Sequence, residues 1–488
     1  MRRTVLLTVL LLLAPAFAGA QQKAKLDTGA LEARIDKILE LDELEKSEVG
    51  IYAIDVETNE VLYAKDADDA FNPASNIKLV TAAVALETVG PHFVWGTRIS
   101  AESVDDDGVV KGPLYLKSEG DPLVLWEDLL SWAAELRAVG VEKVTGGIVV
   151  DDTDFADGFI PPGYDQKDED ASYRAPIGAV SLNFNSQTVV VRPADKVGEK
   201  AEAYLWPPNS NVELVNDVDT VSGGRERISA TSKAKGDGTR IRIRGSIGAD
   251  AEPAYVRKRI DNPSLFAGSA FVKALELAGI TVEGGVRRGE RPDGTRTLIY
   301  KQSEPLAHVV VLMNKWSNNF LAEMLYRHLG RGKGGANTAR ARKAVNGFMD
   351  GVGAGGKGFK TYNGSGLYDG NTITPRQIVT LLDYMTEQPT YPEFAASMAL
   401  GGTDGTLSSR LGGPSTKGVL RAKTGTLNDV TALSGYLETK SGRQVAYSIL
   451  INEPPVRAWK LRRVQDEIVD FRAGDRLTRD EAHHRAVR

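Results

Sequence analysis

Residues 73–86 read PASNIKLVTAAVAL, a proline-led start that is followed by a long apolar run. The apolar positions continue to Leu86, which predicts a helix that begins at Ser75. A spacing of three residues places Lys78 one turn further along the same helix face as Ser75. The N-terminal end of a helix also carries positive potential, which stabilises a developing oxyanion. One interpretation is a nucleophilic serine beside a lysine base; the alternative is a plain N-cap serine.

Two further short motifs could bring polar side chains to this serine–lysine pair. Ser317-Asn318-Asn319 lies in a polar connection between two apolar helical patterns, where side chains can project into a cleft. Lys423-Thr424-Gly425-Thr426 follows the apolar segment 419–422, and we interpret it as the start or body of an edge strand. Each motif is weak alone, so the elements around it must decide its meaning.

Matching patterns elsewhere in the chain show why this context is needed. Ser232-Lys233-Ala234-Lys235 also fits S-x-x-K, but it lies in a polar run without a helical pattern, which predicts a solvated turn. Ser181-Leu182-Asn183 fits S-x-N. Lys440-Ser441-Gly442 fits K-[ST]-G and lies between two alternating apolar segments, which predicts a hairpin loop.

The composition limits the chemistry that this chain can perform. Its 488 residues include 42% hydrophobic and 26% charged residues, which is typical of a globular chain with a buried core. At about 150 residues per domain, this length predicts roughly three domains. Cysteine is absent, and none of the five histidines has the i, i+4 spacing of a zinc-binding helix. We therefore expect no metal and no cofactor, and catalysis by Ser, Lys, Asp or Glu.

The first twenty residues have the pattern of an export signal. Arg2 and Arg3 precede an apolar stretch from Val5 to Leu13, and cleavage is expected after Ala18 or Ala20. The apolar stretch is shorter than the roughly 20 residues of a membrane span, so we expect a periplasmic protein without stable membrane insertion after cleavage. The net charge of −5 argues against nucleic acid or anionic lipid as a partner.

Periodicity divides the chain into helical ends and a β-rich middle. Helical patterns cover 26–46, 75–86, 126–139, 263–278, 308–313, 320–329, 338–349, 375–385 and 391–399, with a last stripe at Leu461, Val464, Ile468 and Phe471. Strand patterns cover 49–55, 60–64, 147–150, 188–191, 239–243, 431–438 and 444–452. The last helix is expected to pack on a sheet rather than on a membrane. The arrangement predicts one α+β domain made from both ends of the chain, with a β-rich insertion from about Thr97 to about Arg296.

In their order and on these elements, the three motifs resemble those of the penicillin-recognising serine peptidases and β-lactamases. The large separation of Ser75 from Ser317 is similar to that of the class C low-molecular-mass penicillin-binding proteins, the D-alanyl-D-alanine carboxypeptidase/endopeptidase group. The resemblance extends from about Leu31 to Phe471. Further segments that carry it are Gly120-Asp121-Pro122, the segments 146–151 and 175–183, Asn363-Gly364-Ser365-Gly366-Leu367 and Asp404-Gly405-Thr406-Leu407.

The resemblance implies a role for each motif residue. Ser75 would be the nucleophile, Lys78 its base, Ser317 a proton relay to the leaving amine, and Asn319 a holder of the substrate amide and of Lys78. The expected substrate-binding residues are Lys423, Thr424, Gly425 and Thr426, in which Lys423 and Thr424 dock a carboxylate and the N–H groups of Ser75 and Thr426 form the oxyanion hole. Lys78 must be neutral to act as a base, and we expect a nearby cation such as Lys423, in a partly desolvated cleft, to lower its pKa.

The same resemblance implies a domain organisation and a substrate. A β-lactamase/transpeptidase-like domain, an antiparallel sheet flanked by helices, would comprise 21–96 and 303–473. Inserted domain II would comprise 97–170 and 255–302, domain III 171–254, and a flexible tail 474–488. The expected partners are peptidoglycan stem peptides and β-lactams. A β-lactamase, for which no deacylating base is evident, and a non-catalytic wall-binding homologue remain as alternatives.

Three further features of the sequence each have more than one interpretation. Asn363 stands where the family usually has Asp, which leaves the choice of peptide side chain open. Residues 351–357 nearly match a phosphate-binding loop, but we expect a flexible link because Gly358 replaces the required Ser or Thr. Asp151, Asp152 and Asp154 could ligate a cation, but a plain turn at a strand end is expected.

Overall fold

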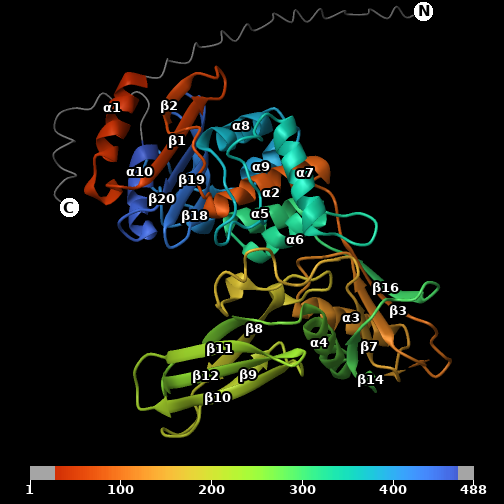
Figure 1. Ribbon diagram of the computed structural model, residues 1–488. Coiled ribbons are helices and arrows are strands. Elements are labelled where there is room, and N and C mark those ends of the chain that lie inside the picture. Colours follow the sequence, from red (N-terminus) through yellow and green to blue (C-terminus); the bar gives the residue numbers. More distant parts are fainter. Residues whose placement is uncertain (1–27, 471–488) are drawn as a thin grey trace, which may run out of the picture.

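The chain folds into two connected bodies, seen one above the other in Figure 1. The computed structural model describes residues 28–470, so the expected signal (1–20) and tail (474–488) lie outside the described residues. The helices are α1 (Thr28–Leu39), α2 (Ile77–Thr88), α3 (Trp126–Ala138), α4 (Pro263–Leu277), α5 (Leu306–Lys315), α6 (Asn319–Leu329), α7 (Thr338–Gly351), α8 (Pro375–Thr386), α9 (Tyr391–Ser397) and α10 (Arg462–Val469).

A six-stranded antiparallel sheet forms the centre of the upper body. Its order is β17 (Ala399–Leu400), β18 (Leu420–Thr426), β19 (Val430–Glu438), β20 (Gln444–Asn452), β1 (Glu48–Asp55) and β2 (Val61–Lys65). Strand β1 pairs with β20, with Ile51 opposite Ile449, so strands from the two ends of the chain complete one sheet. This sheet and its flanking helices confirm the predicted α+β class.

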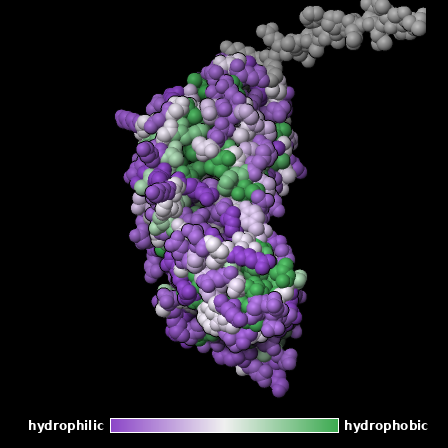
Figure 2. Space-filling view, turned by 90° about the vertical axis from the view of Figure 1, so that its right-hand side faces the viewer, coloured by the Kyte–Doolittle hydropathy of each residue, from purple (hydrophilic) through white to green (hydrophobic). Residues whose placement is uncertain are grey.

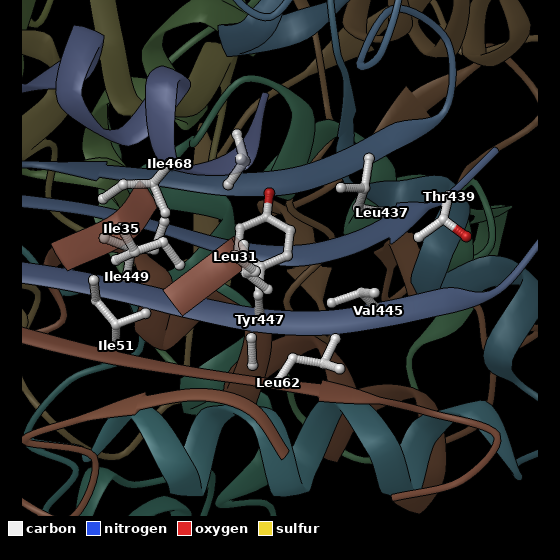
Figure 3. A pocket seen from close by; sticks show the side chains of 12 residues that line it. Leu31, Ile35, Ile51, Leu62, Leu437, Thr439, Val445, Tyr447, Ile449 and Ile468 are labelled. Carbon is white, nitrogen blue, oxygen red and sulfur yellow. The ribbon is translucent and has the colours of Figure 1, made fainter. Parts of the chain in front are cut away.

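Helices cover both faces of this sheet because its strands are apolar on both sides. On the inner face α8 contacts β1, β19 and β20, and α2 lies among α5, α6, α7 and α9. Every residue of α2 from Ile77 to Leu86 is buried. On the outer face α1 and α10 pack over the strands and leave an apolar pocket of about 60 Å³ beside Leu31, Ile468 and Tyr447 (Figure 3). This pocket belongs to the core and lies away from the motif residues.

The segment between α2 and α5 forms the lower body, with four smaller sheets. Their strands, in spatial order, are β15 (Val286–Arg288), β7 (Ile148–Asp151), β5 (Leu114–Ser118), β3 (Gly96–Ala101) and β16 (Arg296–Gln302); β14 (Thr281–Val282), β6 (Lys143–Val144) and β4 (Val109–Val110); β10 (Val212–Val221), β12 (Gly238–Gly248) and β11 (Arg227–Lys235); β13 (Ala254–Arg259), β8 (Ser186–Arg192) and β9 (Glu202–Trp206). Helices α3 and α4 share one apolar core with these strands.

The two bodies are joined by more than the chain that crosses between them. Phe155, Ala175 and Ile177 come from the middle segment, yet they lie in the core cluster of helices α2, α5 and α6. Figure 2 shows a narrow waist between the bodies and a surface that is mostly hydrophilic, with apolar residues gathered in one area on each half. Within residues 28–470 no helix has the length and apolar character that a membrane span requires.

Two of the look-alike motifs can be placed on this fold. Lys440-Ser441-Gly442 lies in the turn between β19 and β20, which confirms the predicted hairpin loop. The prediction of a solvated turn at Ser232 was wrong, because Ser232 is a buried residue within β11. Alternation along a strand places Ser232 and Lys235 on opposite faces, so this S-x-x-K cannot form a serine–lysine pair.

Two glycines at the end of α7 allow a test of the backbone geometry. Gly347 lies inside α7 and Gly353 just after it at φ +75°, and an added Cβ at either position would meet no atom within 4 Å. We expect Gly347→Ala to raise the free energy of unfolding by about 0.5–1 kcal/mol. Gly353→Ala should lower it by about 1 kcal/mol, because a left-handed backbone disfavours a Cβ. Urea unfolding checks both; equal shifts of one sign would contradict the assignment.

Candidate active site

The three motifs meet at a cleft of about 1000 Å³ in the upper body. Ser75 lies in a 3-10 turn (Ala74–Asn76) that leads into α2, Ser317 and Asn319 lie at the connection of α5 and α6, and Thr426 ends β18. These four residues line the cleft. Lys78 and Lys423 are fully buried beneath it. The structure therefore brings together all eight residues that the sequence singled out.

Lys78 is held by three acceptors and has no exposure to water. Its Nζ donates to Ser75 Oγ at 2.9 Å, to Asn319 Oδ1 at 2.7 Å and to the backbone oxygen of Ser365 at 2.5 Å. Burial lowers the pKa of the Lys78 amine from its usual value to about 7, and the negative charge of Glu323 opposes this shift. Desolvation, which the expectation included, is the main cause, whereas the expected lowering by the Lys423 cation is not among the causes.

Glu323 is an important residue that the sequence analysis missed. It is 2% exposed and lies on α6, one turn after Asn319. Its carboxylate accepts from the N–H of Ser365 at 2.8 Å, while the carbonyl of Ser365 accepts from Lys78. Glu323 thus acts on Lys78 through its charge, and both side chains hold the backbone of Ser365, one at its N–H and the other at its carbonyl. The available signal was its spacing of four residues from Asn319 on a predicted helix.

The segment 363–367 supplies the floor beneath Lys78. Asn363 is fully buried, and its Nδ2 donates to the carbonyls of Pro162 and Leu367 while its Oδ1 accepts from Gly366 N at 2.9 Å. An aspartate could not make the two donations. An added Cβ at Gly366 would lie 1.9 Å from Ala74 O, so this glycine permits close packing against the Ser75 turn. Asn363 does not line the cleft, so it has no direct contact through which to select a peptide side chain.

The side chain of Lys423 places a second buried amine next to Ser317. Its Nζ donates to Ser317 Oγ at 2.8 Å and to the backbone oxygen of Thr424 at 2.7 Å. Burial and then the neighbouring Lys78 amine hold the pKa of Lys423 well below its usual range. Ser317 itself has φ +54°, a left-handed conformation that is strained for a serine. Such backbone strain is typical of residues with a functional role.

Strand β18 has a free edge where it faces the cleft. Its neighbour β17 pairs only with Arg421 and Ala422, so Lys423 to Thr426 lie beyond the pairing. The prediction of an edge strand is therefore right for the motif itself, although β18 is the second strand of the sheet. A Cβ at Gly425 would lie 2.9 Å from Pro73 O, so this glycine allows β18 to approach the Ser75 turn.

Residues of the middle segment form one wall of the cleft, which the sequence analysis did not anticipate in detail. Lys167, Glu169 and Tyr173 line this wall. The Asn319 Nδ2 donates to the backbone oxygen of Tyr173 at 3.1 Å. The hydroxyls of Tyr173 and Tyr368 both donate to Glu169 and hold the pKa of its carboxyl below the usual range. A negative charge is thereby fixed at the cleft.

The opposite wall is formed by the segment after β20 and by the loop between β18 and β19. Asp429, Arg457, Trp459 and Arg462 lie there. The Arg462 Nη2 donates to Thr426 Oγ1 at 3.4 Å, so a cation lies next to the last motif residue. No sequence motif marks this wall, because its residues come from an irregular stretch and a short helix.

The candidate cation-binding carboxylates at 151–154 and the glycine-rich segment 351–357 have structural explanations. Asp151 ends β7 and pairs with Lys117, Asp152 pairs with Arg288, and Asp154 pairs with Lys117. These carboxylates are neutralised by protein cations, and no group of three or more potential metal ligands is found within residues 28–470. Residues 351–357 are the end of α7 and the loop that follows it.

The fold and the serine–lysine site define a serine peptidase of the β-lactamase/transpeptidase type. The model of the D-Ala-D-Ala carboxypeptidase 3 (S13) family matches residues 31–474, and the chain belongs to this family. This finding confirms the resemblance that the motifs indicated.

Individual relatives agree with this assignment. The chain is 35% identical to a D-alanyl-D-alanine carboxypeptidase of an Actinomadura species over 92% of this chain and 87% of that protein. It is 24% identical to the D-alanyl-D-alanine carboxypeptidase DacB of Haemophilus influenzae, over 84% and 86%. A crystal structure of penicillin binding protein 4 from Haemophilus influenzae superposes with a TM-score of 0.75 at 22% identity, covering 89% of this chain and 97% of that one.

The charge of Glu323 provides a test of how Lys78 is tuned. Acylation by a β-lactam should depend on neutral Lys78 and rise with a half-maximal pH of about 7. Since Glu323 raises the pKa of Lys78, Glu323→Gln should move the half-maximal pH to a lower value. Acylation rates between pH 5 and about 9 measure it, with the exposed Glu276→Gln on α4 as the control. An unmoved or upward-shifted limb would show that Glu323 does not act on Lys78.

Proposed function

We propose that this protein is a periplasmic serine DD-peptidase that cleaves peptidoglycan stem peptides as a D-Ala-D-Ala carboxypeptidase, a DD-endopeptidase or both. The observation that carries the proposal is the 2.9 Å contact of Ser75 Oγ with a buried Lys78 amine whose pKa is lowered to about 7. About half of such amines are neutral at pH 7, so a base stands beside the nucleophile. The export pattern at the N-terminus and the named relatives support the compartment and the substrate.

The hydrogen bonds of Lys78 suit its proposed role as the base. A neutral amine has two N–H donors and one lone pair. The carbonyl oxygens of Asn319 and Ser365 accept the two donors, which leaves the lone pair for the Ser75 hydroxyl proton. Ser75 Oγ then attacks the carbonyl carbon of the scissile amide as its proton passes to Lys78. The N–H groups of Ser75 and Thr426 stabilise the oxyanion that forms.

The second half of the reaction uses the other buried lysine. As the tetrahedral intermediate collapses, the C–N bond breaks and the amine of the terminal D-alanine leaves with a proton from Ser317. The proton now on Lys78 returns to Ser317 along the cleft. Lys423 Nζ, 2.8 Å from Ser317 Oγ, supports this hydroxyl and, with Thr424, docks the substrate carboxylate. Water then hydrolyses the Ser75 ester with neutral Lys78 as the base, whereas a β-lactam leaves Ser75 acylated.

The charged residues on the cleft walls are the proposed determinants of peptide choice. Glu169 and Lys167 lie on one wall, and Arg457 and Arg462 on the other. The ionised Glu169 carboxylate would attract a cationic group on the peptide side chain, and Arg462 beside Thr426 would attract a carboxylate. Peptide selection is thus assigned to these residues and not to Asn363.

We also propose the domain division given by the sequence, with the catalytic domain at 21–96 and 303–473 and domains II and III inserted between its halves. The middle segment contributes no strand to the six-stranded sheet and has its own core, which supports the division. Phe155 and Ile177 in the catalytic core indicate that the insertion also supports the host domain. Its role in substrate access rests on Tyr173 and Glu169 in the cleft wall.

The β-lactamase alternative is less well supported. Rapid release of a bound β-lactam needs a general base that is dedicated to deacylation. Glu323 is buried and held by backbone N–H groups, and Glu169 is held by two tyrosine hydroxyls. A binding module without catalysis would have no need for two buried lysines, each of which costs free energy to desolvate.

Replacement of the nucleophile tests the proposal. Ser75→Ala should abolish covalent labelling by a fluorescent penicillin and lower hydrolysis of a D-Ala-D-Ala peptide by about 10⁴-fold or more. Ser232→Ala, in the other S-x-x-K, should leave both unchanged. Circular dichroism checks that each variant folds, and mass analysis of products from cross-linked wall peptides separates the two activities. Labelled Ser75→Ala protein would overturn the assignment of the nucleophile.

A further inference from the structure

The outer face of the sheet β13–β8–β9 carries three exposed aromatic side chains. Tyr255 is 71% exposed, Trp206 49% and Tyr204 42%. In the register of this sheet Tyr255, Val190 and Tyr204 form one cross-strand row. Arg257, Thr188 and Trp206 form the next row, two residues along. Partners in a row, and residues two apart on a strand, share a face, so the three rings project from one side. We call this the aromatic face.

The other side of the same sheet is used for packing. Val189 and Val191 are fully buried, and Leu205 and Val256 pack with them in the core of the lower body. On the outer face the Trp206 ring meets the buried Trp126 ring edge-on at 6.4 Å and Val190 is buried, while the rings of Tyr255 and Tyr204 remain exposed. Large aromatic side chains that stay exposed on a flat sheet are typical of a surface that binds a partner.

The aromatic face continues toward the catalytic cleft. Arg257 donates to the backbone oxygen of Asn183 at 2.8 Å and lies over the ring of Phe184. The Phe184 ring meets the ring of Phe320 edge-on at 5.9 Å, and Phe320 is the residue after Asn319. These contacts thus lead from Arg257, which lies in the row of Trp206, to the residue that follows Asn319.

Strand β13 provides a second connection. Lys258, three residues after Tyr255, pairs with Ala171, and Tyr173 lies two residues further on at the cleft wall. At about 3.3 Å per residue, Tyr255 is roughly 10 Å along the strand from Lys258. A polymer on the aromatic face could therefore present a side branch to the cleft.

We propose that the aromatic face binds the sugar rings of the peptidoglycan glycan strand while an attached stem peptide enters the cleft. This inference rests on the proposed function, because it assumes a substrate whose peptide branches from a glycan. Sugar rings have apolar C–H faces that stack on aromatic side chains, and hydroxyls that hydrogen-bond to neighbouring polar groups. Thr188 and Arg257 lie in the same row as Trp206 and offer such groups.

The charges around the rings favour a polymer of low charge density. Arg192 pairs with Glu202 at the end of the face and lies over the ring of Tyr204. This pair is neutral, so Arg257 adds one net positive charge to these three residues, far less than a surface for a polyanion carries. The rings of Tyr204 and Trp206 are two residues apart on one strand, about 7 Å, which suits successive contacts along a chain of sugars.

The test uses peptide-free glycan strands, prepared by removing the stem peptides from purified peptidoglycan with an amidase. The full-length protein should bind these strands, and the triple variant Tyr204→Ser, Trp206→Ser and Tyr255→Ser should lose about tenfold or more in affinity. The single variant Tyr255→Ser should lose severalfold, and its large exposure makes it the change least able to disturb folding. Tyr300→Ser is the matched control, since Tyr300 is 47% exposed on β16 and also lies beneath an arginine.

Two activity measurements separate this proposal from the proposed function. Both sets of variants should hydrolyse a soluble sugar-free peptide at the wild-type rate, whereas turnover of intact peptidoglycan should fall in the aromatic-face variants. Absence of glycan binding by the wild type, wild-type binding by a folded triple or single variant, or an equal loss in Tyr300→Ser would overturn the inference. Failure of the proposed function would appear instead as loss of penicillin labelling and of soluble-peptide hydrolysis in the wild-type protein.

Discussion

The removal of the Lys78 amine from water determines how the rest of the site must be built. An ammonium ion in this position would be costly to bury, and the amine can lose its proton near neutral pH because no solvent stabilises its charge. Its acceptors must then come from the protein. They come from the turn before α2, from α6 and from the 363–367 loop, three parts of the chain that are far apart in sequence. The charge of Glu323 limits the shift in the pKa of Lys78.

Close packing around the Ser75 turn makes this arrangement rigid. Gly366 and Gly425 approach the turn from opposite sides, and a side chain at either position would meet backbone atoms of residues 73 and 74. Protein interiors transmit such displacements because they are densely packed. Glycine is therefore required at these two motif positions for close packing, whereas the neighbouring motif residues are required for their chemistry.

The sequence predicted the parts of this structure that depend on local pattern. The apolar run of α2 and the apolar periodicity of α6 and α8 are strong, and the order of the three motifs indicated the family and predicted the eight site residues. Ser232 was misjudged because a polar strand on one face of a small sheet has a weak periodic signal. The positions of Glu323 and Tyr173 in the site depend on contacts between segments that are distant in sequence. The lowering of the pKa of Lys78 by burial depends on such contacts too. Local periodicity does not report how deeply an amine lies or which carbonyl reaches it.

The pairing of β1 with β20 has a consequence for how the chain acquires its shape. Strand β1 leaves the ribosome before the whole middle segment, whereas β20, its neighbour in the sheet, is synthesised after that segment. The six-stranded sheet therefore cannot close until the middle segment has been made, and that segment can complete its own core sooner. Long-range pairing of this kind slows folding and keeps strand edges unpaired for longer. A chain cut short before Gln444 would retain Ser75 and Lys78 and yet lack the strand that joins β1 to the rest of the sheet.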